Sequence, residues 1–308
     1  MITKNFYHKK VGKMLNKVAN SIFKIFIEIF IFDKTKRSKI KAKYAKQCIR
    51  KYVDSAAKNI KILPQNTTPQ KHIIWQYWHQ GKENAPELIQ KCFESVKQQM
   101  PEYEQIILSF DTIKDYVDLP QRYYDLVKQG NMSIAHFSDI LRTYLLSDPR
   151  WGGTWVDSTI YLTGKIPDDI MNSKFCVLQK NPQTDNQENK MSCFFIHSRP
   201  ESANINALKN FLDKYWAEND FVINYFFYEH ASTMLSDLTP ELKQEWDSMP
   251  YYDAEISGNL QKEMFKEFSE ATWNKLISQT SIHKLSYKKF PEQILKNSYY
   301  NYIINKEI

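Results

Sequence analysis

The sequence predicts an α/β protein, in which a sheet flanked by helices follows a basic helical N-terminal extension. Three observations predict this class. Apolar, β-branched runs alternate with helix-like segments from residue 71 onward. Glycine is rare, at seven in 308 residues, yet two glycines stand together at Gly152 and Gly153. Positive charge is concentrated before residue 61, and a hydrophobic content of 42% is ordinary for a packed core.

Residues 1–63 are expected to form a basic, amphipathic helical extension that associates with an anionic membrane surface. Residues 1–60 hold sixteen lysines and arginines against three acidic residues, so they carry +13 and the rest of the chain carries −6. Residues 18–32 are rich in Phe and Ile, but Lys24 and Glu28 interrupt them. The uninterrupted runs are far shorter than the ~20 residues of a spanning helix, which favours a helix lying in the membrane interface. Alternatives are a helix packed on the body of the protein and a nucleic-acid-binding tail.

The second predicted domain covers residues 71–308, after a linker at residues 64–70 that Pro64 and Pro69 suggest. Its first elements are a strand within residues 71–81, a helix at 86–100, a strand at 104–111 and helical material at 113–130. This order is typical of nucleotide-binding α/β domains, whose ligands lie at the carboxyl ends of the strands. Later elements are strands at 174–183 and 191–200, helices at 205–216 and 224–235, and a short terminal helix.

Residues 133–163 combine an amphipathic helix, a glycine turn and a strand. The helix runs from an N-cap at Ser133 toward Pro149, with its apolar residues in one sector and Asp139 and Arg142 together on the opposite side. Residues 154–162 alternate as one strand, in which Asp157 faces the same way as Trp155, Thr159 and Tyr161. From these residues alone, an ion pair on a solvated helix face is an equally good interpretation of Asp139 and Arg142.

The order S-D-x-x-R at residues 138–142, then G-G-x-W-x-D at residues 152–157, resembles the donor-binding core of GT-A glycosyltransferases. It is most similar to bacterial capsular polysaccharide synthesis glycosyltransferases, which are related to outer-chain mannosyltransferases and clostridial glucosylating toxins. The resemblance implies a GT-A-like fold with a Rossmann-like mixed sheet. It also implies that Asp139, Arg142 and Asp157 bind a nucleotide-sugar donor, with Arg142 and Asp157 as catalytic residues.

The resemblance implies a divalent metal, Mn²⁺ or Mg²⁺, at Asp157, but Thr159 stands where the family pattern has a second aspartate. A hydroxyl is a weak ligand for a hard cation, so metal dependence stays open. Residues 281–288 resemble a C-terminal H-K-L-[ST] element of the family. This implies His283 as a metal ligand and Lys284 as a partner of the donor diphosphate; the alternative is an exposed basic loop.

Three further candidates come from the same resemblance. Trp78 takes the place of the tryptophan that stacks on the nucleotide base, a contact that typically contributes ~1 to 3 kcal/mol; the alternative is a core tryptophan beside Trp75. In the helix predicted at residues 224–235, Asn224 stands where an aspartate is common. Glu229 is a substitute base, and a surface glutamate is the alternative.

The sequence therefore predicts a cytoplasmic glycosyltransferase, held at the inner face of the cell membrane, that extends a capsular, exopolysaccharide or lipid-linked glycan. No G-x-G-x-x-G or P-loop motif occurs, which disfavours dinucleotide enzymes and P-loop kinases. The four cysteines lack C-x-x-C spacing, which is against a disulfide framework or zinc cluster. The alternatives are a non-catalytic membrane-surface protein that keeps the fold, as Thr159 and Asn224 would allow, and a nucleic-acid-binding protein. No nucleic acid is expected as a partner, because no recognised binding motif accompanies the basic tail.

Overall fold

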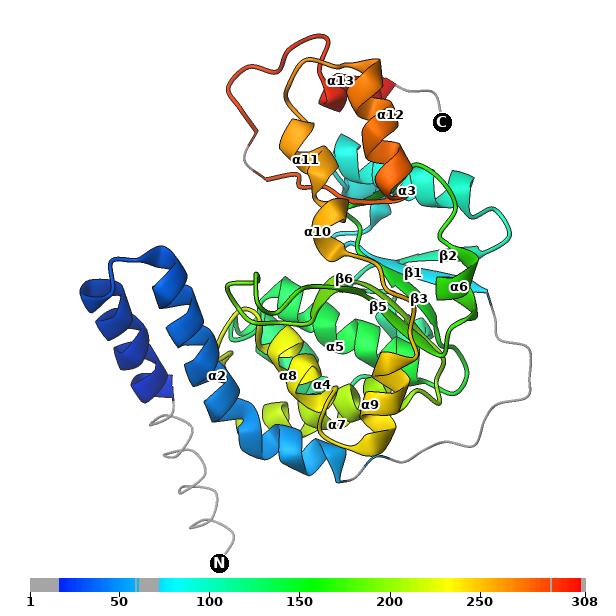
Figure 1. Cartoon of the computed structure of the whole chain (residues 1–308). Helices are drawn as coiled ribbons and strands as arrows, with labels where there is room; N and C mark the ends of the chain where they lie inside the picture. The colour runs from blue at the N-terminus through cyan, green and yellow to red at the C-terminus, as the bar shows by residue number, and fades with distance from the viewer. Residues whose placement is uncertain (1–16, 59, 61–71, 289, 306–308) are drawn as a thin grey trace, which may run out of the picture.

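The fold is a five-stranded mixed sheet in the order β2-β1-β3-β6-β5, with helices against both faces (Figure 1). This confirms the predicted α/β class. The computed structural model describes residues 17–58, 60, 72–288 and 290–305, so the predicted linker at residues 64–70 lies outside the described residues.

The main sheet and a second, two-stranded sheet contain the strands β1 (Ile73–Tyr77), β2 (Glu104–Leu108), β3 (Gly153–Val156), β4 (Ile160–Leu162), β5 (Phe175–Gln179), β6 (Met191–Ser198) and β7 (Ile282–Lys284). The α-helices are α2 (Lys34–Ala57), α3 (Glu87–Gln99), α4 (Gln121–Lys128), α5 (Ile134–Ser147), α6 (Asp168–Asn172), α7 (Ala203–Glu218), α8 (Phe227–Leu235), α9 (Pro240–Asp247), α10 (Ala254–Ser257), α11 (Asn259–Glu263), α12 (Glu270–Gln279) and α13 (Tyr299–Asn305). Short 3-10 helices occur at η1 (Lys82–Asn84) and η2 (Ile113–Asp115).

Strand β1 lies at the centre of the parallel part of the sheet, with β2 on one side and β3 on the other. The chain crosses from β1 to β2 through α3, and then returns through α4 and α5 to β3 on the opposite side of β1. The chain thus leaves β1 toward one edge of the sheet and comes back to β3 on the other side of β1. The carboxyl ends of β1 and β3 are therefore where ligands of open α/β sheets bind.

Both faces of β1 are buried, so most of its residues are apolar, and the side-chain oxygen of its one polar residue, Gln76, accepts from Gln105 at 2.6 Å. Trp75 faces the cluster that contains Phe137 of α5, while Ile74 faces the cluster that contains Val96 of α3. Trp75 is fully buried, and its Nε1 donates to the Gly152 carbonyl at 2.8 Å. It is a core residue.

The paired glycines have a steric reason. Gly152 and Gly153 have φ angles of +67° and +105°, which side chains rarely tolerate. A Cβ on Gly153 would stand 2.6 Å from the Ile73 carbonyl oxygen, because β3 approaches β1 closely at this point. The predicted tight turn is confirmed.

The single strand predicted across residues 154–162 is wrong. The chain breaks after β3 into a turn, where the Ile160 N–H donates to the Asp157 carbonyl at 2.9 Å, and then enters β4 of the small sheet. Asp157 and Thr159 therefore lie in a turn at the end of β3, and do not share a strand face with Trp155 and Tyr161.

Two helix boundaries also differ from the prediction. Helix α8 begins only at Phe227, since the Asn224 side chain accepts from the Phe226 N–H at 2.8 Å and forms a turn before it. Residues 113–130 hold η2 and the short α4, which Pro120 precedes, instead of continuous helix.

The C-terminal elements α10 to α13 form a unit that packs on α3 (Figure 1). A shared apolar cluster joins Leu88 and Cys92 of α3 to Leu260, Trp273 and Tyr299. This packing brings β7 beside β4, with Lys284 opposite Ile160, although more than a hundred residues separate them in sequence.

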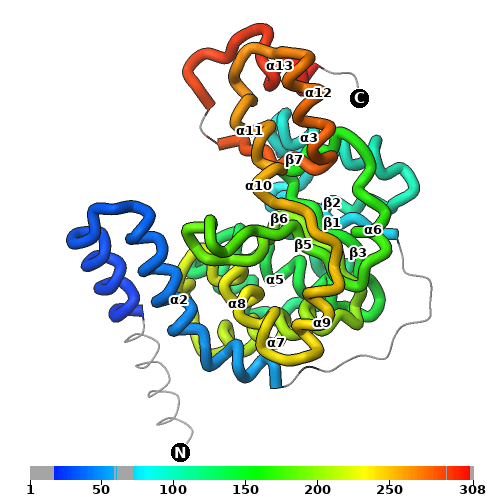
Figure 2. The backbone as a smooth tube through the Cα atoms, in the orientation of Figure 1, coloured from blue at the N-terminus to red at the C-terminus, as the bar shows by residue number. Residues whose placement is uncertain are grey.

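Helix α2 is part of the domain core, whereas the sequence suggested that residues 1–63 form a separate extension. It lies along α7 and α8 (Figure 2) and buries a stripe of apolar side chains at helical spacing: Ala42, Ala45, Ile49, Tyr52, Val53 and Ala56. Lysines dominate the composition of this helix but occupy its other faces, so the stripe is free to pack.

Candidate functional site

Helix α5 carries Asp139 and Arg142, and Arg142 meets Asp157 at the carboxyl end of β3. Ser133 caps its N-terminus and accepts from the His136 N–H at 3.3 Å, as predicted. The exposed fractions of Asp139 and Arg142 are only 6% and 3%, so the solvated ion pair is wrong. Strands β3 and β6 pack against one side of α5. Tyr228 of α8 contacts the polar side of the helix, which the sequence pattern alone predicts to face solvent.

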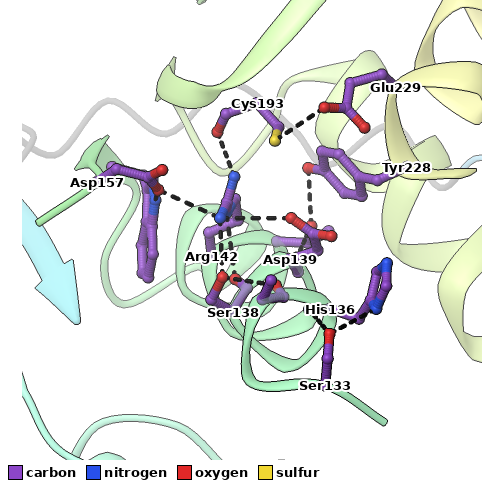
Figure 3. A network of polar contacts seen from close by, with 12 residues as sticks. Ser133, His136, Ser138, Asp139, Arg142, Asp157, Cys193, Tyr228 and Glu229 are labelled. Carbon is purple, nitrogen blue, oxygen red and sulfur yellow. Dashed lines mark hydrogen bonds and ion pairs between the residues drawn. The ribbon is translucent and has the colours of Figure 1, made fainter. Parts of the chain in front are cut away.

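Arg142 is the centre of the site (Figure 3). Its guanidinium lies 3.3 Å from Asp157 Oδ1 and 3.4 Å from Asp139 Oδ1, and it donates to the Cys193 carbonyl. Ser138 accepts two further hydrogen bonds, at its carbonyl (3.2 Å) and its hydroxyl (2.9 Å). The planar fork of arginine can serve all these partners at once, which a lysine cannot.

Asp157 joins the helix to the C-terminal unit. Its Oδ1 accepts from Trp155 Nε1 at 2.8 Å, and its Oδ2 accepts from Lys284 Nζ at 2.7 Å. Burial is the largest single influence on the Asp157 pKa and raises it, but Lys284, Arg142 and the hydrogen bonds together hold that pKa below its usual range. Asp157 is therefore an anion between two cations.

Two more carboxyl groups lie near Arg142, and their pKa values are raised, whereas that of Asp157 is lowered. Burial, with repulsion from Asp157, raises the pKa of Asp139 to about 7 against the attraction of Arg142. Burial and the nearby Asp139 raise the pKa of Glu229 to about 7 as well. Glu229 is 7% exposed and accepts from the Cys193 thiol at 3.2 Å, so it is not a surface glutamate.

The site also contains residues that sequence reasoning missed. Cys193 of β6 contributes its carbonyl to Arg142 and its thiol to Glu229, and no sequence signal marks a backbone acceptor. Tyr225 lies beside His136, with its ring 5.5 Å from the imidazole, and burial together with the nearby Cys193, Asp139 and Glu229 raises the pKa of its hydroxyl to about 12.

The structure places the remaining candidates as follows. Trp78 follows β1, with its ring 5.2 Å from that of Tyr287 at 73°, and its buried Nε1 has no hydrogen-bond partner within the described chain. The Asn224 side-chain oxygen accepts a hydrogen bond from the backbone in the turn before α8.

The structure does not bring His283 to Asp157. Neighbouring residues of a strand point to opposite faces, so His283 points away from the face on which Lys284 meets Asp157. Its buried imidazole lies against the Thr163 hydroxyl at 3.0 Å, and burial lowers its pKa to about 4. No group of three or more His, Cys, Asp or Glu side chains suited to a metal occurs among the residues that the structure describes.

Comparison with known proteins supports the predicted family. Residues 25–303 match the sequence profile of a family described as "Capsular polysaccharide synthesis protein". Among solved structures, the chain is similar to one titled "PaToxG Glycosyltransferase", with a TM-score of 0.36 and 14% identity over 79% of this chain and 95% of that chain. No curated protein matches the chain. Because the profile match spans nearly the whole sequence, the chain belongs to the capsular polysaccharide synthesis protein family.

Proposed function

We propose that this protein is a glycosyltransferase that moves a sugar from a nucleoside diphosphate donor to a capsular, exopolysaccharide or lipid-linked glycan. The observation that carries this proposal is the convergence of Asp139, Arg142, Asp157 and Lys284 at the carboxyl ends of β1 and β3. Family membership supports sugar transfer as the class of reaction.

The proposed reaction breaks the bond between the sugar C1 and the diphosphate oxygen and forms a bond from C1 to an acceptor oxygen. Negative charge grows on the departing diphosphate, and fixed cations in a partly buried site stabilise it best. Lys284 and Arg142 supply those cations. The carboxylates of Asp139 and Asp157 accept hydrogen bonds from sugar or ribose hydroxyls and so orient the donor.

The acceptor hydroxyl must lose its proton when its oxygen bonds to C1. Glu229 suits this task because a carboxyl with a pKa near the working pH both takes up and releases a proton. Asn224 does not suit it, since a neutral amide is not a base and its oxygen is already bonded in a turn.

A donor screen tests the proposal. Purified protein is melted with a panel of UDP- and GDP-sugars, and those that raise Tm are then tested for slow hydrolysis. At least one nucleotide sugar should raise Tm and release nucleoside diphosphate. If none does either, while an oligonucleotide raises Tm, the nucleic-acid alternative replaces this proposal.

Trp78→Ala should weaken nucleoside diphosphate binding by about 1 to 3 kcal/mol, because a base would lose its stacking surface. The partly buried ring of Trp78 beside Tyr287 motivates this. Trp75→Ala is the matched control and should chiefly lower stability, by roughly 3 to 5 kcal/mol, as core truncations do. Calorimetric titration with UDP and GDP separates the two. Equal affinity in Trp78→Ala and the parent would assign Trp78 to the core alone.

We propose further that the N-terminal helix holds the protein on the inner face of an anionic membrane. Residues 17–30 form this helix, in which Phe23 stacks on Tyr44 of α2 and Ile27 is buried. Its opposite face exposes large apolar side chains at helical spacing: Val18, Ile22, Ile25, Phe26, Ile29 and Phe30. Arg37 and Lys41 neutralise Glu28, so acidic charge is compensated beside this face.

The charge of this region suits an anionic lipid surface, because residues 1–60 carry +13 and each lysine near such a surface contributes about 1 kcal/mol. Within the described chain, no helix is long and apolar enough to span a membrane. The four cysteines are free thiols, which agrees with a reducing compartment.

Replacing Ile22, Phe26 and Ile29 together by Ser should reduce co-flotation with anionic liposomes at least tenfold, since three apolar side chains would no longer enter the interface. Rising salt should weaken binding of the parent as well. The alternative is that this apolar face binds a second copy of the chain, which light scattering on the parent and the triple variant tests. Unchanged flotation with a change from dimer to monomer would assign this face to self-association instead.

A further inference from the structure

We propose that the Lys284 ammonium takes the place of the divalent cation in this site, so that donor binding needs no metal. The inference rests on the proposed function and concerns how the same site meets the donor diphosphate. It departs from the family pattern, in which two aspartates, at the positions of Asp157 and Thr159, hold a metal.

The position of the ammonium is the first support. Lys284 Nζ donates to Asp157 Oδ2 at 2.7 Å and to Thr159 Oγ1 at 2.6 Å. These two residues stand where the family pattern has its two aspartates. A cation thus bridges the two side chains that would otherwise share a metal ion.

The remaining ligand set does not suit a divalent metal. Hard cations need several oxygen ligands, preferably anionic ones, and here Asp157 is the carboxylate in the turn. Its Oδ1 already accepts from Trp155 and Arg142, and Thr159 offers only a hydroxyl. His283 points to the other face, toward Thr163. Two cations on one carboxylate would also repel a third, more highly charged one.

Lys284 is held in place by backbone as well as by its own hydrogen bonds. Strand β7 pairs with β4 so that Lys284 lies opposite Ile160, and the Leu285 N–H donates to the Thr159 carbonyl at 2.9 Å. The C-terminal unit therefore fixes the ammonium relative to the turn that carries Asp157 and Thr159. This is the preorganisation that stabilises a developing charge without later rearrangement.

The Lys284 ammonium can still donate one hydrogen bond to the nucleotide-sugar donor. It has three N–H groups, and the hydrogen bonds to Asp157 and Thr159 use two of them. The side chain is 30% exposed, so the third N–H can meet a phosphate oxygen that arrives from solvent. Lysine binds phosphate well as a point charge.

Titration calorimetry of the full chain with UDP and GDP tests the inference, once in EDTA and once with Mn²⁺. We expect one of the two nucleotides to bind with equal affinity, within about threefold, under both conditions. Binding that appears only with Mn²⁺ would overturn the inference and leave the proposed function standing. No binding of either nucleotide under both conditions would overturn the proposed function and this inference together.

Lys284→Met, titrated in EDTA, should bind the nucleotide at least tenfold more weakly. Lys275→Met is the control, since Lys275 is an exposed lysine on α12 of the same C-terminal unit, and its affinity should equal that of the parent. Equal affinity in Lys284→Met, with a normal melting curve, would overturn the inference.

The double variant Thr159→Asp with Lys284→Ala tests whether a metal ion can bind where the Lys284 ammonium lies. It restores two carboxylates and removes the ammonium, so Mn²⁺ should now strengthen nucleotide binding at least tenfold over EDTA. An affinity that does not respond to Mn²⁺ would contradict the statement that Lys284 occupies the place of the cation.

Discussion

Asp157→Asn is expected to lower the rate of sugar transfer a hundredfold or more, which corresponds to about 2.7 kcal/mol of barrier. The carboxylate accepts from Arg142, Trp155 and Lys284, so it holds both cations of the site in one geometry. An amide keeps the shape but loses the charge that positions them. Arg142→Lys should have a similar effect, because a single ammonium cannot replace a fork that serves Asp139, Asp157 and the Cys193 carbonyl.

The two variants should differ in stability. Arg142 is 3% exposed, and its removal leaves buried acceptors at Ser138 and Cys193, each costing roughly 1 to 3 kcal/mol. Asp157 is at the edge of the site, with 24% of its side chain exposed, and should cost less. Rates must therefore be normalised to the folded fraction, measured by circular dichroism.

Arg150→Lys is the matched control for Arg142→Lys. Arg150 also pairs with an aspartate, Asp148, but its side chain is 56% exposed. Both its rate and its melting temperature should stay near those of the parent, since exposed ion pairs contribute little to stability. Turnover of Asp157→Asn and Arg142→Lys within threefold of the parent would mean that the catalytic site lies elsewhere.

The part of the stability that Glu229 provides should fall as pH rises from about 4.5 to about 7. Burial raises the pKa of Glu229 from 4.5 to about 7, so in this range the native protein holds a proton that the unfolded chain has released. The stability that this proton provides is complete below pH 4.5 and is lost as pH passes 7. The loss from Glu229 alone amounts to about 3 kcal/mol at most, and Asp139 should add to it in the same direction.

Glu229→Gln isolates this contribution. The glutamine is uncharged at every pH, so the variant should melt several degrees above the parent at pH 8 and close to it at pH 5. Glu292→Gln, at an exposed glutamate of a surface loop, should follow the parent at both values. Parallel melting curves for Glu229→Gln and the parent across pH 5 to 8 would contradict a raised pKa at this site.

Much of the site could be predicted from local sequence. Ser133 and Pro149 bound a helix, the glycine pair requires a tight turn, and the spacing of Asp139, Arg142 and Asp157 places them on adjoining elements. These predictions succeed because capping, positive φ and helical spacing depend on residues a few positions apart.

The rest of the site depends on contacts between distant segments, which no local pattern records. Periodicity tells which residues share one face of a helix, but not whether a second element covers the other face, as β6 and α8 cover Asp139 and Arg142. The same limit applies to α2, whose composition is basic although one stripe packs into the core.

Lys284 shows most clearly which features follow from the sequence and which depend on contacts between distant segments. Sequence resemblance marks it as a phosphate-binding residue, yet its contacts with Asp157 and Thr159 exist only because the C-terminal unit packs on α3 and pairs β7 with β4. The sequence alone determined the α/β class, the motif and the residues of the proposed donor site. Only the tertiary structure decided their protonation tendencies and the placement of the second cation, because burial and long-range charge pairing arise when distant elements meet.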